Sequence, residues 1–475
     1  MADQMRVERD LMGEKKIPKQ AYYGIQTMRA VENFPITGYP PHVELIRGLG
    51  YVKKAAAMAN RDVGALSPNI ADAIIEAAQE VIDGHLNGEF IVDSIQGGAG
   101  TSLNMNANEV IANRAIEIIG GEKGDYIHVS PTTHVNMAQS TNDALPTAIH
   151  IACLKLSSGL IDALSGAIEA IKEKEAEFDD VIKMGRTHLQ DAVPIRLGQE
   201  FGAYRRVLER DLKRFKQSVN QLYEINMGAT AVGTGLNAMP EYIDNVVGYL
   251  QELTGHPFYS AEHLVDATQN TDVYTQLSSS MKILSINLSK QANDLRLMSS
   301  GPRTGLNEIN LPPRQAGSSI MPGKVNPVMC EVVNQIAFQV QGNDQTISLA
   351  SEAGQLELNV MQPVLVFNLL QSFTILQNGL NVYREYAIEG MTANVERCRE
   401  LVEHSVGIIT AINPHVGYET ASRIAKEAIS SGRSVREICV EKGILTEEEL
   451  NQILDPQDMT NPGVSGRDLL YRDRK

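Results

Sequence analysis

The segment FGAYRRVLERDLKRFKQSVNQL, residues 201–222, repeats apolar side chains at every third or fourth position. This spacing places them on one face of an α-helix. A helix of this length with a single apolar stripe is typical of an antiparallel bundle, in which each helix buries its stripe against its neighbours. The stripe consists of Phe201, Tyr204, Leu208, Leu212, Phe215, Val219 and Leu222.

The same period recurs further along the chain, at Val273, Leu277, Met281, Leu284, Leu288, Ala292 and Leu295. Strand-like alternation is scarce between residues 140 and 396, so this region is predicted to be a central bundle of long helices. Residues 1–139 combine turns rich in Gly and Pro with helical stretches such as 69–84, which predicts a mixed, mainly helical N-terminal domain. Residues 397–475 are predicted to form a small C-terminal helical domain. The fold class is therefore predicted to be all-α.

Helix boundaries are marked most clearly in the C-terminal region. Gly432 is suited to end one helix, because glycine readily adopts the left-handed conformation found there. Ser434 with Glu437 has the spacing of a capping box at the start of the next helix. Thr446 with Glu449 repeats that spacing.

Composition narrows the class of protein. The chain has 475 residues and a formal charge of -16. Such a charge repels nucleic-acid phosphates and anionic lipid, so neither partner is expected. No apolar leader or long uninterrupted apolar run is present, and a cytoplasmic enzyme is predicted. The cysteines are too far apart for a disulfide framework or a structural zinc site, and no metal is expected; they are Cys153, Cys330, Cys398 and Cys439.

The segment GSSIMPGKVNP, residues 317–327, is the richest in chemistry. It lacks the spacing of a phosphate-binding P-loop, and Val325 follows Lys324 where a P-loop has a hydroxyl. It is instead a hydroxyl-rich loop leading into a helix, with Asn326 as a suitable N-cap and Pro327 as the first helical residue. A helix N-terminus beside Lys324 favours a carboxylate. The alternative that Asn326 only caps the helix stays open.

Three other segments carry neutral donors. They are GGAGTSLNMNANEV (97–110) with Thr101, AQSTND (138–143) with Ser140, Thr141 and Asn142, and MGRTHLQDAVP (184–194) with Thr187 and His188. We expect each near the start of a helical stretch, with Pro146 in the first turn of the second. Singly, the hydroxyl residues could serve only as caps and His188 could be structural. Together they favour a site for small carboxylates over a metal or nucleotide site.

These segments resemble, in the right order, the conserved regions of the fumarase/aspartase superfamily. GSSIMPGKVNP is similar to its signature loop, and AYYGIQTMRAVENF and INPHVGYETA extend the resemblance over essentially the whole chain. Thr141 within QSTND and the continuation KVNPVMCEVVNQ resemble the aspartase branch. Cys330 departs from that pattern, because aspartases commonly have Pro there and fumarases have Cys. A class II fumarate hydratase, converting fumarate to L-malate, is therefore the alternative.

The resemblance implies a three-domain protomer and a homotetramer whose core is the central helix bundle. It also implies active sites built from three subunits and a loop around residues 317–326 that closes over the substrate. The implied reaction is the reversible elimination of ammonium from L-aspartate to give fumarate, without a cofactor. L-aspartate, fumarate and ammonium are the implied small-molecule partners.

The resemblance also assigns roles to residues. Ser318 is the general base, and the hydroxyls of Thr101, Ser140, Thr141 and Ser319 bind the carboxylate that becomes an aci-carboxylate dianion. Lys324 and Asn326 hold the other carboxylate. Asn142, Thr187 and His188 surround the amino group, and Glu331 is expected to orient His188, which serves either as an acid or only as a ligand.

Overall fold

The computed structural model describes residues 4–471, without the side chain of Tyr471. Helices dominate, which confirms the all-α class. The chain forms two compact units, consisting of residues 4–162, 211–285 and 336–377 (unit 1) and residues 163–210, 286–335 and 378–471 (unit 2). Five helices carry residues of both units: α5 (Thr141–Glu177), α6 (Leu197–Val219), α9 (Asp272–Met298), α10 (Val328–Glu352) and α11 (Gln362–Tyr383). The predicted boundaries of three domains stay a prediction, and their outermost residues, 1–3 and 472–475, lie outside the described residues.

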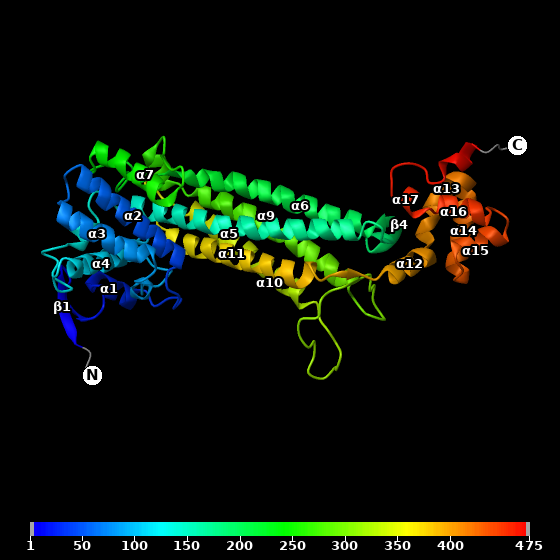
Figure 1. Ribbon diagram of the computed structural model, residues 1–475, viewed down its shortest axis with the longest axis horizontal. Coiled ribbons are helices and arrows are strands. Elements are labelled where there is room, and N and C mark those ends of the chain that lie inside the picture. Colours follow the sequence, from blue (N-terminus) through cyan, green and yellow to red (C-terminus); the bar gives the residue numbers. More distant parts are fainter. Residues whose placement is uncertain (1–3, 472–475) are drawn as a thin grey trace. The chain divides into compact units, whose positions relative to one another are not determined.

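Unit 1 begins with an antiparallel hairpin that the sequence did not predict, β1 (Met5–Asp10) with β2 (Gly13–Pro18). Three helices then pack side by side, namely α2 (Val43–Asp62), α3 (Pro68–Ile82) and α4 (Thr101–Ile118) (Figure 1). The predicted helix at 69–84 is α3. Unit 1 also contains α1 (Ile25–Asn33), α7 (Pro240–Thr254), α8 (Leu264–Gln269), and the parallel pair β5 (Glu224–Ile225) and β6 (Tyr259–Ser260).

Within unit 1, segments of the long helices pack through apolar and polar contacts. The rings of Phe215 on α6 and Phe373 on α11 meet edge to face, with 6.0 Å between centroids. Ser278 of α9 donates a hydrogen bond of 2.8 Å to the carboxylate of Asp344 on α10. The predicted apolar series on α6 and α9 therefore lie on packed helices.

Unit 2 has its own packed segments of the same helices. The hydroxyl of Tyr204 on α6 donates to Asp294 on α9 at 2.8 Å, and the side-chain amide of Asn334 on α10 donates to the hydroxyl of Ser289 at 2.8 Å. Its other elements are β3 (Ile182–Thr187), β4 (Gln190–Arg196), β7 (Ile309–Asn310), β8 (Thr392–Ala393), α12 (Val395–His404), α13 (Ile409–Val416), α14 (Tyr418–Ser431), α15 (Val435–Glu441), α16 (Glu447–Ile453) and α17 (Pro456–Met459).

The predicted helix boundaries of the C-terminal region are confirmed. Gly432 ends α14 with a φ of 71°. The capping boxes of Ser434 with Glu437 and Thr446 with Glu449 are both formed, at the starts of α15 and α16. Side chains of these helices surround Met184 of β3, which is fully buried in their shared core.

Helix α5 differs from the prediction at its start. It begins at Thr141, so Pro146 lies in its second turn and not in its first. This helix is long and apolar enough to cross a membrane by length and composition, and it is the one such helix among the described residues. Half of its most apolar window is buried within the protein. A core helix of a soluble bundle has the same properties, so this feature is weak evidence for a membrane.

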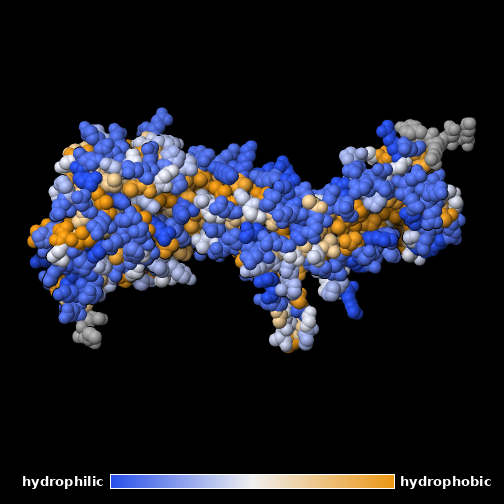
Figure 2. Space-filling view, viewed as in Figure 1, coloured by the Kyte–Doolittle hydropathy of each residue, from blue (hydrophilic) through white to orange (hydrophobic). Residues whose placement is uncertain are grey.

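The four cysteines are free thiols, and all are buried. Burial raises the pKa of Cys330 and of Cys398 to about 12. Apolar side chains also reach the surface between polar ones (Figure 2). On α10, Phe338 and Leu349 are 64% and 55% exposed.

Candidate active site

Unit 1 brings the segments of Thr101 and Ser140–Asn142 together. Thr101 is the first residue of α4, and it follows Gly100 at a φ of 88°. A Cβ atom on Gly100 would lie 2.2 Å from a methyl group of Leu145, in the second turn of α5. Only a glycine therefore allows the start of α4 to approach α5 this closely. The side-chain amide of Asn104 donates a hydrogen bond of 3.2 Å to the hydroxyl of Thr141, which joins the two helix starts.

A buried carboxylate, that of Asp143, holds the turn that begins α5. It accepts hydrogen bonds from the backbone N–H of Ser140 at 2.9 Å, of Thr230 at 3.0 Å and of Gly228 at 3.1 Å. Burial raises the pKa of Asp143 to about 6, and these three bonds oppose the rise. The glycine-rich segment at 228–237 thus holds Asp143 and the turn that begins α5.

Asn142 is fixed from the same side. Its side-chain amide donates to the carbonyl of Ala231 at 2.7 Å, and its own carbonyl accepts from the amide of Asn226 at 3.0 Å. Ser140 and Asn142 are half-buried, Thr141 is buried, and Thr101 is exposed. The four predicted residues of unit 1 thus lie at two adjoining helix N-termini, where backbone N–H groups favour an anion.

A buried lysine that was not among the predicted site residues lies behind this turn. Lys53 of α2 is fully buried, and its ammonium donates to Asn104 at 2.7 Å, Gln139 at 2.9 Å and Asn136 at 3.0 Å. Burial lowers the pKa of Lys53 to about 7, and the negative charge of Asp143 opposes this. A signal was present: Lys53 lies four residues after Leu49, on the buried stripe of its helix.

In unit 2, Thr187 and His188 lie at the turn of the β3–β4 hairpin, which precedes α6. Both are exposed, and His188 has a φ of 55°. Ion pairs anchor the base of the hairpin, because Glu308 accepts from Arg186 at 2.7 Å and lies 3.3 Å from the ammonium of Lys183. The hairpin itself was not predicted, but the motif does lie near the start of a helical stretch, because α6 begins at Leu197.

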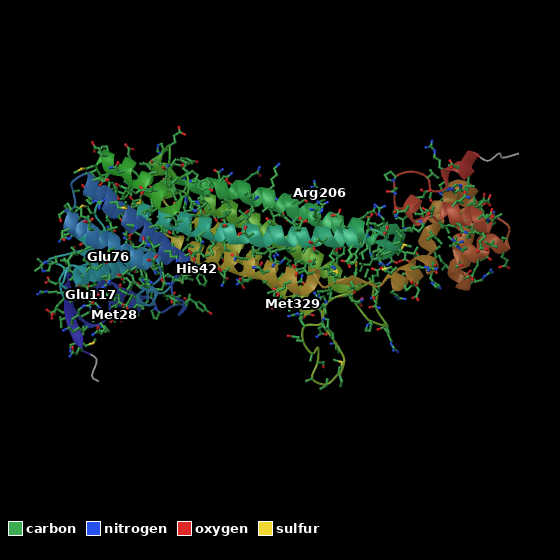
Figure 3. The ribbon with its side chains drawn as sticks, viewed as in Figure 1. Met28, His42, Glu76, Glu117, Arg206 and Met329 are labelled. Carbon is green, nitrogen blue, oxygen red and sulfur yellow. The ribbon has the colours of Figure 1, made fainter. Side chains whose placement is uncertain are left out.

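The loop between α9 and α10 carries the remaining predicted residues. The backbone N–H of Gly317 donates to the carbonyl of Lys324 at 2.9 Å, and the amide of Asn326 donates to the carbonyl of Gly317 at 3.0 Å. These two bonds close a ring that contains Ser318 and Ser319. Ser318 is half-buried, whereas Ser319 and Lys324 are exposed. Figure 3 shows Met329, where this loop joins α10, and side chains of the loop that extend away from the helices.

The prediction that Asn326 caps α10 was wrong. The helix begins at Val328, and the carbonyl of Pro327 accepts the hydrogen bond from Glu331 that opens it. The Asn326 side chain bonds to Gly317 instead, so it closes the loop. Glu331 lies in the first turn of α10. Within residues 4–471, no hydrogen bond or ion pair joins Glu331 to His188, and its orienting role stays a prediction. The described residues also hold no group of three His, Cys, Asp or Glu side chains placed for a metal ion.

We expect Gly317→Ala to lower activity at least tenfold without unfolding the protein. The added Cβ would lie 2.5 Å from the carbonyl oxygen of Lys324, so the ring must open. A displacement of about 1 Å in a catalytic group costs about 100-fold in rate. Steady-state kinetics would measure the loss of activity, and thermal unfolding would verify that the variant is folded. Gly248→Ala is the control, because open space surrounds its Cβ position; equal activity of the two variants would contradict the prediction.

Comparison with known proteins places the chain in a family. Residues 13–342 match the family model described as Lyase, and residues 408–461 match that of the fumarase C C-terminus. The chain is 64% identical over 467 residues to an aspartate ammonia-lyase of Bacillus subtilis, covering 98% of each chain. The chain belongs to the fumarase/aspartase superfamily. Another relative in this superfamily is the aspartate ammonia-lyase of Escherichia coli, which is 47% identical over 470 residues and is matched over 98% of each chain.

Solved structures of the superfamily agree with this membership. A fumarate lyase:delta crystallin from Brucella melitensis, bound to cobalt, matches with a TM-score of 0.94 and 47% identity, over 97% of this chain and all of that one. A class II fumarase from Schistosoma mansoni matches with a TM-score of 0.92 and 34% identity, over the same shares. The same fold therefore occurs in a protein described as a fumarate lyase:delta crystallin and in a class II fumarase.

Proposed function

We propose that the chain catalyses the reversible elimination of ammonium from L-aspartate to give fumarate. The observation that carries this proposal is the identity of 64% to an aspartate ammonia-lyase over 98% of both chains. The site supports it, because hydroxyls and amides gather at two helix N-termini of unit 1, and a serine and a lysine share one bonded loop of unit 2. These groups are suited to small carboxylates.

The difficult step is removal of a proton from the carbon next to the side-chain carboxylate. The carbanion formed pushes its charge onto that carboxylate, which becomes an aci-carboxylate with two negative charges. Donors fixed in advance stabilise such an intermediate, and the loss of one costs about 3 kcal/mol. Thr101, Ser140, Thr141 and Ser319 supply hydroxyl donors. The N-termini of α4 and α5 add backbone N–H groups.

Ser318 is the proposed general base. A serine alkoxide is costly at neutral pH, and lowering its pKa by about five units requires about 7 kcal/mol. The charge of Lys324 and the backbone N–H groups of the loop supply this stabilisation once the loop closes over the substrate and excludes water. In the open loop, the hydroxyl oxygen of Ser318 accepts a hydrogen bond of 3.2 Å from the backbone N–H of Ile320.

The second carboxylate of the substrate needs a positive charge beside it, and the amino group needs partners while it leaves. Lys324 and Asn326 hold the second carboxylate, and Asn142, Thr187 and His188 surround the amino group. The amino group of L-aspartate is already protonated at neutral pH, so the C–N bond breaks with its electron pair passing to nitrogen and releases neutral ammonia. The ammonia then takes up a proton from water to become ammonium, and no strong acid is required. No cofactor enters this mechanism.

We further propose a cytoplasmic homotetramer whose core is formed by the long helices, with each active site built from three subunits. The exposed Phe338 and Leu349 of α10 support this, since an interface between copies would bury them. Light scattering coupled to size exclusion would measure the mass, and a monomer with full activity would contradict the proposal. No nucleic acid or membrane partner is expected.

The direct test is fumarate formation, followed by ultraviolet absorbance, from L-aspartate and separately from L-malate. Fumarate from L-aspartate alone supports the ammonia-lyase. The alternative, fumarate hydratase, is favoured by one specific observation, the cysteine at position 330, and it predicts fumarate from L-malate alone. That second result would overturn the proposed function.

A further inference from the structure

The mechanism above does not use the fully buried ammonium of Lys53 on α2. Three side-chain amides surround it, at 2.7 Å (Asn104), 2.9 Å (Gln139) and 3.0 Å (Asn136). A buried charge that lacks compensating partners strongly destabilises a fold. This one is fully provided with acceptors, and all three come from the segments that begin α4 and precede α5.

The chemistry of an ammonium fixes how these amides are oriented. It has three donors and no acceptor, so each amide must present its oxygen to Lys53 and direct its NH₂ group elsewhere. The NH₂ group of Asn136 donates to the carbonyl of Gln139 at 3.1 Å. That of Gln139 donates to the carbonyl of Val135 at 3.0 Å. Hydrogen bonds from these side chains therefore fix the backbone that leads to Ser140.

The NH₂ group of Asn104 has a different role. It donates to the hydroxyl oxygen of Thr141 at 3.2 Å, besides an equally long bond to Asn136. Thr141 therefore accepts on its buried side, and its own proton is left to donate elsewhere. Among the described residues Thr141 donates to no protein group, whereas Thr147, further along α5, donates to the carbonyl of Asp143 at 2.8 Å.

We propose that Lys53 is a positioning residue for the elimination reaction, acting through Asn104 to make the Thr141 hydroxyl donate toward the substrate. The inference rests on the proposed function, in which Thr141 stabilises the aci-carboxylate. Lys53 itself does not touch the substrate. It determines the polarity of a short chain of hydrogen bonds, from ammonium to amide to hydroxyl.

The sharpest test is Asn104→Asp, because it reverses that polarity. A carboxylate still accepts from Lys53, but it offers Thr141 an acceptor, so the hydroxyl turns inward. We expect kcat on L-aspartate to fall about 10- to 100-fold. The variant should remain folded, because the new carboxylate pairs with the ammonium of Lys53, and thermal unfolding would verify this. An unchanged kcat in this folded variant would overturn the inference.

A double-mutant cycle separates positioning from general support. Lys53→Met, compared with Lys54→Met as control, should lower kcat more than it raises KM. The neighbouring Lys54 bonds Gln79, outside this network. In a Thr141→Val background the loss from Lys53→Met should shrink to about twofold or less, because coupled residues are not additive. Asn104→Asp in that background should likewise have little effect, which tests the chain of bonds even if Lys53→Met fails to fold.

The controls distinguish two failures. A wild-type protein inactive on L-aspartate overturns the proposed function and this inference together. The inference alone is overturned if the wild type is active but the effects of Lys53→Met and Asn104→Asp do not depend on Thr141. In that case each variant would lower kcat by the same factor in the Thr141 protein and in the Thr141→Val protein. Both measurements use the full chain and the same fumarate assay.

Discussion

Replacing Ser318 with alanine is expected to abolish turnover of L-aspartate and leave the fold intact. General-base catalysis contributes about 100- to 10,000-fold to a rate, so kcat should fall toward the upper end of that range. The KM should change little, because the hydroxyl makes no charge contact with the bound substrate. Stability should be preserved, since Ser318 is half-buried in a loop and accepts a single hydrogen bond, from Ile320.

The control for this variant lies on the same loop. Thr304→Ala removes a hydroxyl from an exposed position and should retain wild-type kinetics. Both variants should have the unfolding temperature of the wild type. Substantial residual activity of Ser318→Ala would mean that another group removes the proton, and the assignment of the base would then be wrong.

Lys324→Met is expected to lower kcat/KM for L-aspartate by about 30- to 5,000-fold. Loss of a charged partner that is buried against its counter-charge costs about 2–5 kcal/mol. Lys324 is exposed in the loop, so its removal should cost no folding stability. In the proposed mechanism Lys324 binds a substrate carboxylate and stabilises the alkoxide of Ser318, so KM should rise as well as kcat fall.

Arg303→Met provides the matched control, because it removes one positive charge from an exposed position of the same loop. A general effect of charge on the approach of an anionic substrate would lower kcat/KM equally in both variants and would weaken at high salt. A loss confined to Lys324→Met supports a direct contact. Equal losses would contradict it.

Periodicity predicted the helices well, because the apolar stripes of α6 and α9 are uninterrupted. It failed for the β3–β4 hairpin, and the reason is physical. Lys183 of β3 is buried, where alternation would place an apolar residue, because it pairs with Glu200 at 2.8 Å and with Glu308. A strand that buries a charge has no readable alternation. The partners come from distant segments, which a local pattern cannot indicate.

For the candidate site, too, the sequence indicated what a local pattern can show and missed what depends on distant contacts. Its hydroxyl residues and Lys324 occur in segments whose composition is unusual, so the sequence indicated them. Asn326 was assigned to the helix start, but a bond to Gly317, nine residues earlier, determines its position. Lys53 and Asp143 were missed because their importance depends on burial behind the turn. A lysine on an apolar helix face was the one available signal.

The buried thiols give the chain an experimental advantage. Cys153, Cys330, Cys398 and Cys439 are all enclosed, and burial raises the pKa of each of them. A thiol that stays protonated and shielded reacts slowly with maleimides. The native protein is therefore close to a cysteine-free background for labelling. A fluorophore attached through Thr304→Cys would then report from the loop of Ser318 alone, and stopped-flow fluorescence with substrate would test the proposed closure of that loop.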